Sequence, residues 1–265
     1  MLPVLAFPMI DPVLVQIGPF AIRWYALAYI AGIVIGWRVA RRLVQWAPKV
    51  ATAEQVDDYV TWVTLGIIAG GRLGYVLFYR PGYYVTAPWE ALYIWQGGMS
   101  FHGGALGVMV ATWWFARRNG LDWVAFADRV VCVVPIGLFF GRLANFINGE
   151  LWGRVTDVPW AMVFPTGGPE PRHPSQLYQA LLEGLLLFVL LWLYARGPRR
   201  LGEVSAAFLV GYGLLRFTAE FWREPDAHLG LLGLGLSMGQ WLSLPLVLAG
   251  AALWGWAHRQ RATAA

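Results

Sequence analysis

Charged residues and cysteine are both scarce in this chain. Of its 265 residues, only 13% are Asp, Glu, Lys or Arg, whereas 58% are apolar. A soluble domain carries about 25% charged residues, so this chain has too few to cover a surface that faces water. The one cysteine, Cys132, lies in an apolar run at 130–134, which excludes an intrachain disulfide and a cysteine zinc cluster. The composition therefore indicates a membrane protein.

Several catalytic motifs are missing as well. The sequence contains no His-Glu-x-x-His and no P-loop, which excludes the usual zinc protease and P-loop nucleotide sites. The net charge of +5 does not predict nucleic-acid binding, because the basic residues form short clusters between apolar runs, as membrane topology requires. Residues 1–20 carry no Lys or Arg, so we expect no secretory leader and a first helix that stays in the mature protein.

Long apolar runs dominate what is present. About 20 helical residues cross a hydrocarbon core of about 30 Å. Seven stretches approach this length: 20–39, 59–79, 97–116, 123–147, 177–195, 206–221 and 238–257. The sequence thus predicts an all-α integral membrane protein, a bundle of about seven transmembrane helices in a single membrane domain over 1–265. Residues 80–96 and 148–174 are aromatic or proline-rich, and we expect them to form a small extracytoplasmic cap.

Basic residues orient the predicted spans. Eleven of the twenty Lys and Arg residues follow the first, third, fifth and seventh spans: Arg38, Arg41, Arg42, Lys49, Arg117, Arg118, Arg196, Arg199, Arg200, Arg259 and Arg261. Cytoplasmic loops are enriched in such residues. The sequence therefore predicts an N-terminus outside and a C-terminus in the cytoplasm.

Polar groups inside the spans are the most informative residues, because charge at membrane depth is expensive and usually faces a bundle interior. In the predicted orientation they all lie near the outer ends of their spans. They are Tyr25, Arg72, His102, Arg142, Asn145, Arg216 and Glu220. Arginine matches phosphate oxygens through its planar fork, so the set predicts a site for a lipid phosphate. The alternative is that each arginine pairs with an acid and locks helices together; Arg216 and Glu220 are four residues apart, and Arg223 continues their face.

Two segments add further candidate groups. His102 lies between glycine pairs in the string 97–104, and an imidazole can take a proton from a thiol or hydroxyl. A lone histidine is more often structural; the surrounding arginines favour catalysis here. In the string 141–154, Arg142 and Asn145 share a helical face, glycines can end the helix, and Glu150 can pair with Arg154 across the turn. The remaining histidines, His173, His228 and His258, are expected to be surface or capping residues.

These strings together resemble the bacterial prolipoprotein diacylglyceryl transferases. The matching segments are 23–25, 70–75, 97–104, 141–154, 172–178, 212–226 and 237–240, in the expected order over about 11 to 258. The sequence departs from the family pattern at Ala144, where glycine is common, and at Arg23, where histidine is common. The loop between Trp160 and His173 looks short, which bears on the shape of the cap.

The resemblance implies a reaction and its partners. A diacylglyceryl group would move from phosphatidylglycerol to the lipobox cysteine of a prolipoprotein, giving a thioether and glycerol phosphate. The family implies no metal and no organic cofactor, a monomer in the membrane lipid of the bacterial inner membrane, and no nucleic-acid partner. The enzyme would need no nucleophile of its own, since the substrate supplies the thiol.

The resemblance also implies site roles. Its catalytic residues would be His102, Arg142 and Arg216, with the arginines on the phosphate and His102 deprotonating or orienting the thiol. Its substrate-binding residues would be Tyr25, Arg72, Asn145, Glu150, Gly153, Arg154, Glu220 and Arg223. Two rival functions remain open: a lipid or anion transporter, which would need an alternating-access path, and a structural protein, in which Arg72, Arg142 and Arg216 would each have a dedicated carboxylate.

Overall fold

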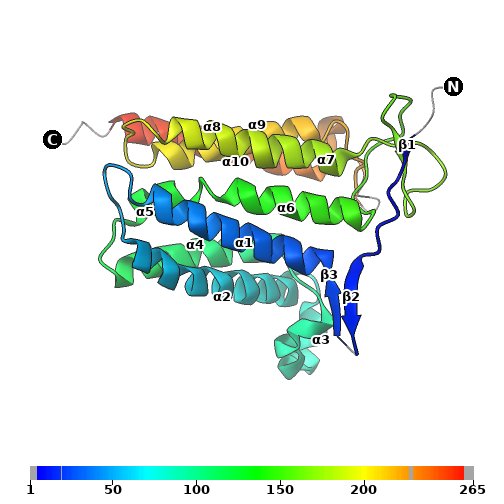
Figure 1. The fold of residues 1–265 in the computed structure, drawn as a ribbon, viewed down its shortest axis with the longest axis horizontal. Coiled ribbons are helices and arrows are strands. Elements are labelled where there is room, and N and C mark those ends of the chain that lie inside the picture. Colours follow the sequence, from blue (N-terminus) through cyan, green and yellow to red (C-terminus); the bar gives the residue numbers. More distant parts are fainter. Residues whose placement is uncertain (1–4, 19, 227–228, 260–265) are drawn as a thin grey trace. The chain divides into compact units, whose positions relative to one another are not determined.

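A computed structural model of the protein describes residues 5–18, 20–226 and 229–259. The chain forms two compact units, one made of Met1–Ala40 with Asp128–Ala265 and the other of Arg41–Ala127. The helices are α1 (Trp24–Leu43), α2 (Ala53–Phe78), α3 (Pro81–Thr86), α4 (Phe101–Arg118), α5 (Trp123–Val130), α6 (Val134–Ile147), α7 (Ser175–Gln179), α8 (Leu187–Tyr194), α9 (Glu203–Ala219) and α10 (Met238–Arg259) (Figure 1). The strands are β1 (Leu5–Ala6), β2 (Val13–Ile17), β3 (Phe20–Arg23) and β4 (Met162–Val163).

The membrane class predicted from composition agrees with the helices. Among the described residues, four helical stretches are long and apolar enough to cross a membrane: Ala53–Phe78, Trp123–Ile147, Ser175–Tyr194 and Met238–Arg259. The other three predicted spans correspond to α1, α4 and α9, and α9 has 17 residues. The structure thus supports an all-α integral membrane protein and leaves the number of seven spans as a prediction.

The predicted start of the first span is wrong. Phe20–Arg23 is a strand that pairs antiparallel with Val13–Ile17, and α1 begins only at Trp24. A short apolar run with β-branched residues satisfies a strand as well as a helix, so composition alone did not separate the two. The fourth predicted span is also interrupted, because a turn at 131–133 separates α5 from α6.

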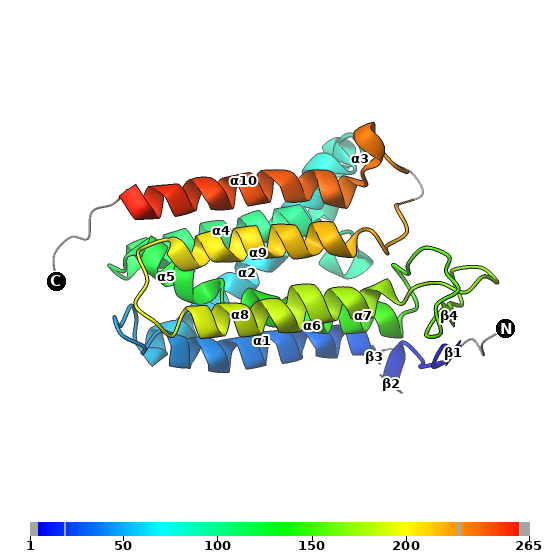
Figure 2. The same ribbon diagram turned by 90° about the horizontal axis from the view of Figure 1, so that it is seen from above.

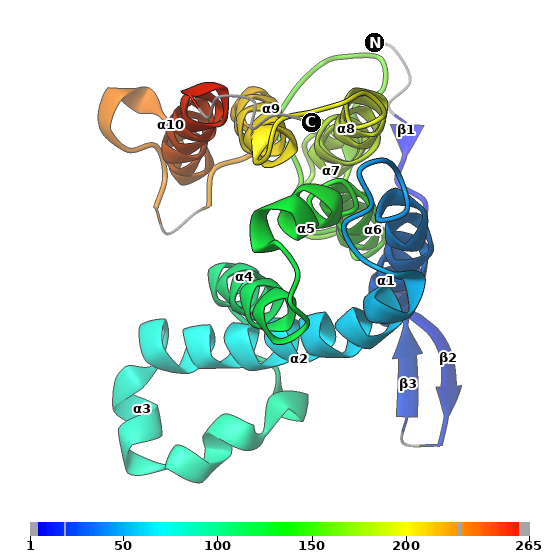
Figure 3. The same ribbon diagram turned by 90° about the vertical axis from the view of Figure 1, so that its left-hand side faces the viewer.

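The unit formed by Arg41–Ala127 is a helical hairpin with an irregular outer segment. Thr52 and Gln55 form a capping box that starts α2, with Gln55 N 3.2 Å from Thr52 Oγ1 and Thr52 N 2.9 Å from Gln55 Oε1. Glycines bring α2 and α4 into backbone contact; a Cβ on Gly70 would lie 2.4 Å from the carbonyl oxygen of Gly103. Beyond α2 the chain turns through α3 and two 3₁₀ turns, Pro88–Leu92 and Ile94–Gln96 (Figure 3).

The other unit carries the remaining helices. In it, α9 packs along α10, and α6 packs along the helix that runs from α7 into α8 (Figure 2). A π-helical segment, Ala180–Leu186, joins α7 to α8. Single π turns inside α-helices occur frequently at functional sites. A loop cap follows α6, in which β1 pairs with β4 and Arg172 forms bridges with Val155 and Met162.

Candidate active site

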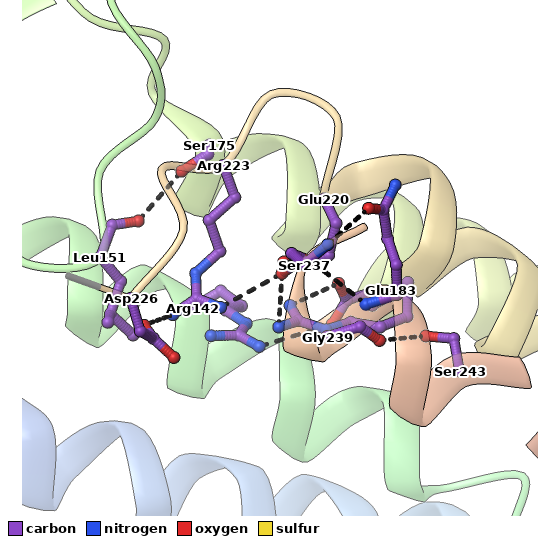
Figure 4. A network of polar contacts seen from close by, with 12 residues as sticks. Arg142, Leu151, Ser175, Glu183, Glu220, Arg223, Asp226, Ser237, Gly239 and Ser243 are labelled. Carbon is purple, nitrogen blue, oxygen red and sulfur yellow. Dashed lines mark hydrogen bonds and ion pairs between the residues drawn. The ribbon is translucent and has the colours of Figure 1, made fainter. Parts of the chain in front are cut away.

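Two arginines from different helices meet at one buried carboxylate. Arg142 comes from α6, Arg216 from α9, and Glu183 from the π-helical segment. Glu183 is fully buried, and its carboxylate oxygens lie 3.6 Å from Arg142 Nη2 and 3.2 Å from Arg216 Nη1. Extra residues in a π turn rotate the helix face, which is consistent with a carboxylate turned inward from an otherwise apolar helix. Figure 4 shows Arg142 and Glu183 within this network.

A second buried carboxylate extends the cluster. Glu220 forms one ion pair with Arg216 at 2.6 Å and another with Arg223 at 3.2 Å. This is the pairing along one helix face that the sequence offered as the alternative to phosphate binding. Ser237, just before α10, donates a hydrogen bond of 2.6 Å to the other oxygen of Glu220. Arg223 also contacts Asp226 at 2.8 Å, but Asp226 is 41% exposed and lies at the edge. With this edge carboxylate included, the cluster joins three guanidiniums to three carboxylates.

Arg142 is the least satisfied member of this cluster. Its side chain is only 17% exposed, yet within the described part of the chain it makes one ion pair at 3.6 Å and no hydrogen bond. A guanidinium has five N–H donors in a fixed fork, and buried donors are normally paired. Arg142 can therefore offer its fork to an anionic group that approaches the cluster.

A polar turn follows α6 next to this arginine. Asn145 and Asn148 both donate to Glu150 Oε1, at 2.8 and 3.2 Å. Gly149 has φ +66°, a left-handed conformation that glycine adopts at low cost and that ends the helix here. Gln176 at the start of α7 donates to the carbonyl oxygen of Glu150 at 2.7 Å. Glu150 is thus fixed at the end of the helix that carries Arg142.

Tyr25 belongs to the same neighbourhood. It is the second residue of α1, half-buried, with its ring centroid 5.2 Å from that of Tyr29. Tyr25 belongs to the same compact unit as Arg142 and Glu150, and its role in the site stays a prediction.

Gly153 and Arg154 make their contacts within the loop cap and the segment that follows α9. A Cβ on Gly153 would lie 2.5 Å from the carbonyl oxygen of Trp222 and 2.6 Å from His173, so the chain's own backbone occupies the space beside this glycine. Arg154 Nε donates to the carbonyl oxygen of Arg223 at 3.1 Å. The predicted Glu150–Arg154 pair is not formed within the described residues. Partial burial lowers the pKa of His173 below its usual 6.5.

Arg72 lies in the other unit, and backbone carbonyl oxygens accept the hydrogen bonds of its guanidinium. It is 5% exposed, and its guanidinium donates to the carbonyl oxygens of Glu90 at 2.7 Å, Ala91 at 2.8 Å, Gly97 at 2.5 Å and Gly98 at 3.2 Å. These acceptors belong to the segment that follows α3. Arg72 therefore holds that segment against α2.

His102 also belongs to the second unit, as the second residue of α4. Ser100 caps this helix by accepting a hydrogen bond from Gly103 N at 3.2 Å. The His102 side chain is exposed and stands beside the Phe101 ring, with centroids 5.7 Å apart. It is therefore accessible at the start of a helix, where the sequence placed it.

Comparison with known proteins decides the family. Residues 12–256 match the family model described as prolipoprotein diacylglyceryl transferase. The chain belongs to this family. The phosphatidylglycerol–prolipoprotein diacylglyceryl transferase of Gluconacetobacter diazotrophicus is 58% identical over 258 residues, which cover 96% of this chain and 92% of the relative. The proteins of the same name from Paramagnetospirillum magneticum and Rhodospirillum rubrum are 58% and 57% identical, and each match covers at least 97% of both chains.

Family membership confirms the resemblance seen in the motifs. The sequence-based prediction of the site did not include one central residue, Glu183. Glu183 lies inside the apolar stretch 177–195, and it is a charge at membrane depth just as Arg142 and Arg216 are. The same cost argument applied to acids would have found it. Among the described residues, no group of three or more His, Cys, Asp or Glu side chains is placed to bind a metal.

Proposed function

We propose that Arg142 and Arg216 bind the phosphate of phosphatidylglycerol while this protein transfers the lipid's diacylglyceryl group to a prolipoprotein. Membership of the prolipoprotein diacylglyceryl transferase family and the names of its relatives support the overall reaction. The protein acts as a transferase in lipoprotein maturation. The acceptor is the thiol of the lipobox cysteine, and the product is a thioether.

One observation carries the phosphate assignment. Arg142, whose side chain is 17% exposed, makes one ion pair at 3.6 Å and donates no hydrogen bond to the described residues. A bidentate phosphate would satisfy its fork. Charge develops on the phosphate oxygen as the glyceryl C–O bond breaks, and fixed donors in a low-dielectric site stabilise that charge.

The remaining groups take supporting roles in this proposal. The thiolate sulfur attacks the glyceryl carbon, the C–S bond forms, the C–O bond breaks, and glycerol phosphate leaves with the bonding electrons. His102 accepts the thiol proton or orients the thiol. Tyr25, Asn145 and Glu150 position the lipid or thiol. Glu220 and Arg223 hold Arg216, Gly153 and Arg154 hold the cap, and Arg72 holds the segment after α3.

The membrane topology extends the same proposal. Seven spans with the N-terminus outside and the C-terminus in the cytoplasm would place the arginine cluster near the outer leaflet of the bacterial inner membrane, where a secreted lipobox arrives. The protein would act as a monomer. The basic clusters after alternate spans support this orientation.

A purely structural role fits the contacts less well. It requires a dedicated carboxylate for each of Arg72, Arg142 and Arg216. Arg216 has such a partner in Glu220 at 2.6 Å, but Arg142 shares Glu183 with Arg216. Among the described residues, the Arg72 guanidinium donates its hydrogen bonds to carbonyl oxygens. A transporter would share the arginine cluster, so product formation is the discriminating observation.

The test is a reconstituted reaction. Purified full-length protein is mixed with phosphatidylglycerol and a lipobox peptide that contains cysteine. Mass spectrometry should detect the diacylglyceryl increment on the peptide together with released glycerol phosphate. His102→Ala should abolish or strongly reduce both products, whereas Leu190→Ala on an exposed position of α8 should leave them intact. Lipid movement without a thioether product would favour the transporter.

A further inference from the structure

Gln179 is a buried amide whose polar atoms are both unused. Its side chain is fully buried, and neither Nε2 nor Oε1 has a hydrogen-bond partner among the described residues. Leaving a buried donor or acceptor unpaired costs about 1–3 kcal/mol, and native proteins rarely accept that cost without a reason. An apolar side chain would fill the same space without this cost. The amide therefore requires an explanation beyond packing.

The position of Gln179 ties it to the arginine cluster. It lies three residues after Gln176, with which it shares one face of α7, and four residues before Glu183 in the chain. Glu183 bonds Arg216 at 3.2 Å, and Gln176 bonds the Glu150 carbonyl oxygen at 2.7 Å. Gln179 is the last residue of α7, and Glu183 belongs to the π-helical segment that follows, so Gln179 lies on the loop-cap side of Glu183 along the chain.

We propose that Gln179 is a specificity-determining residue that binds the hydroxyl groups of the glycerol headgroup. This inference rests on the proposed function, in which the lipid phosphate occupies the arginine pair. In the proposed topology the acyl chains lie in the bilayer and the loop cap lies outside it, so the headgroup extends from the phosphate toward the cap. A glycerol hydroxyl can donate to Oε1 and accept from Nε2, so it satisfies both atoms of the amide.

The same arrangement disfavours other headgroups. An ammonium headgroup offers only donors, so it would leave Nε2 of Gln179 unpaired, and it would add positive charge beside Arg142 and Arg216. A saturated alkyl headgroup would leave both amide atoms unpaired. Sites built to bond a hydroxyl reject analogues that lack it, because the buried polar groups then remain unsatisfied.

The test varies lipid and side chain together. Transfer to a lipobox peptide is measured with the full-length protein, using phosphatidylglycerol and phosphatidylpropanol, which share the phosphate and acyl chains but differ in the headgroup hydroxyls. The wild-type protein should prefer phosphatidylglycerol by about tenfold or more in kcat/KM, the loss expected for a hydrogen bond of ordinary strength. In Gln179→Met, which keeps the length of the side chain, the preference should fall to within about twofold.

A matched control and a second variant complete the experiment. Leu181→Ala changes an exposed residue on the same helix and should keep the wild-type preference. If Gln179→Met does not fold, Gln179→Glu keeps the size and polarity but loses the donor, and its preference should also fall. A preference that persists in the folded variant, or that the wild-type protein lacks, overturns the role of Gln179. Absence of transfer with either lipid in the wild-type protein would instead contradict the proposed function.

Discussion

Replacing Glu183 by glutamine removes the charge between two buried arginines and keeps the shape of the side chain. Arg142 and Arg216 lie 3.6 and 3.2 Å from its oxygens, and Glu183 is fully buried. After the substitution, Glu220 still pairs with Arg216 and Arg223, whereas Arg142 loses its ion-pair partner among the described residues. The variant therefore isolates the electrostatic contribution of this carboxylate.

The expected effect on stability is large. Removing one partner of a buried ion pair typically costs about 3–5 kcal/mol, because the other charge stays buried without compensation. For a chain of this size, each kcal/mol lowers Tm by about 2–4 °C. We expect the Tm of Glu183→Gln to fall by roughly 10 °C. Glu170→Gln changes an exposed carboxylate and should leave the Tm within about 1 °C of wild type, since exposed charges contribute little.

The assay is thermal unfolding of purified protein in detergent, with and without added glycerol phosphate. An anion that binds the arginine pair replaces the missing carboxylate charge, so it should raise the Tm of Glu183→Gln more than that of the wild-type protein. Equal Tm values for Glu183→Gln and Glu170→Gln would refute the reasoning. So would a Tm increase of the same size in all three proteins.

Three further changes probe the supports of the site. Ser237→Ala removes a 2.6 Å hydrogen bond to Glu220 and should lower the free energy of unfolding by about 1.5–3 kcal/mol, measured by denaturant titration. Gly153→Ala would place a Cβ 2.5 Å from the Trp222 carbonyl oxygen, so limited proteolysis should cut the cap at least several-fold faster. Burial in the folded protein lowers the pKa of His173 below 6.5. The unfolded chain therefore binds this proton at a higher pH than the folded chain, and the free energy of unfolding decreases as pH falls through 6.5. His173→Gln should reduce this fall in Tm between pH 7.5 and 5; an unchanged profile would exclude His173 as its source.

The sequence predicted most of the helices because membrane spans are long and their composition is unambiguous. It did not predict where α1 begins, since residues 20–22 are apolar and the run is short enough for either a strand or a helix. It also gave no sign of the π-helical segment at Ala180–Leu186. One extra residue per turn leaves no mark in an apolar run that is rich in leucine.

The sequence predicted which residues belong to the candidate site better than it predicted which groups those residues contact. Arg142, Arg216 and Glu220 stood out because charge in an apolar span is costly, and the Arg216–Glu220 pair follows from their spacing. The hydrogen-bond partners of Arg72 could not be predicted in this way. They are carbonyl oxygens about 20 residues further along an irregular segment, and the positions of carbonyl groups depend on the folded backbone.

The central claim is that the fork of Arg142 binds the lipid phosphate, and Arg142→Lys tests it most directly. Lysine keeps the positive charge opposite Glu183 but loses the planar pair of donors. We predict that kcat/KM for diacylglyceryl transfer from phosphatidylglycerol falls by about 100-fold or more, the effect typical of losing a donor that stabilises developing charge, while the Tm stays within about 5 °C of wild type. A lysine variant with wild-type kcat/KM would contradict the account.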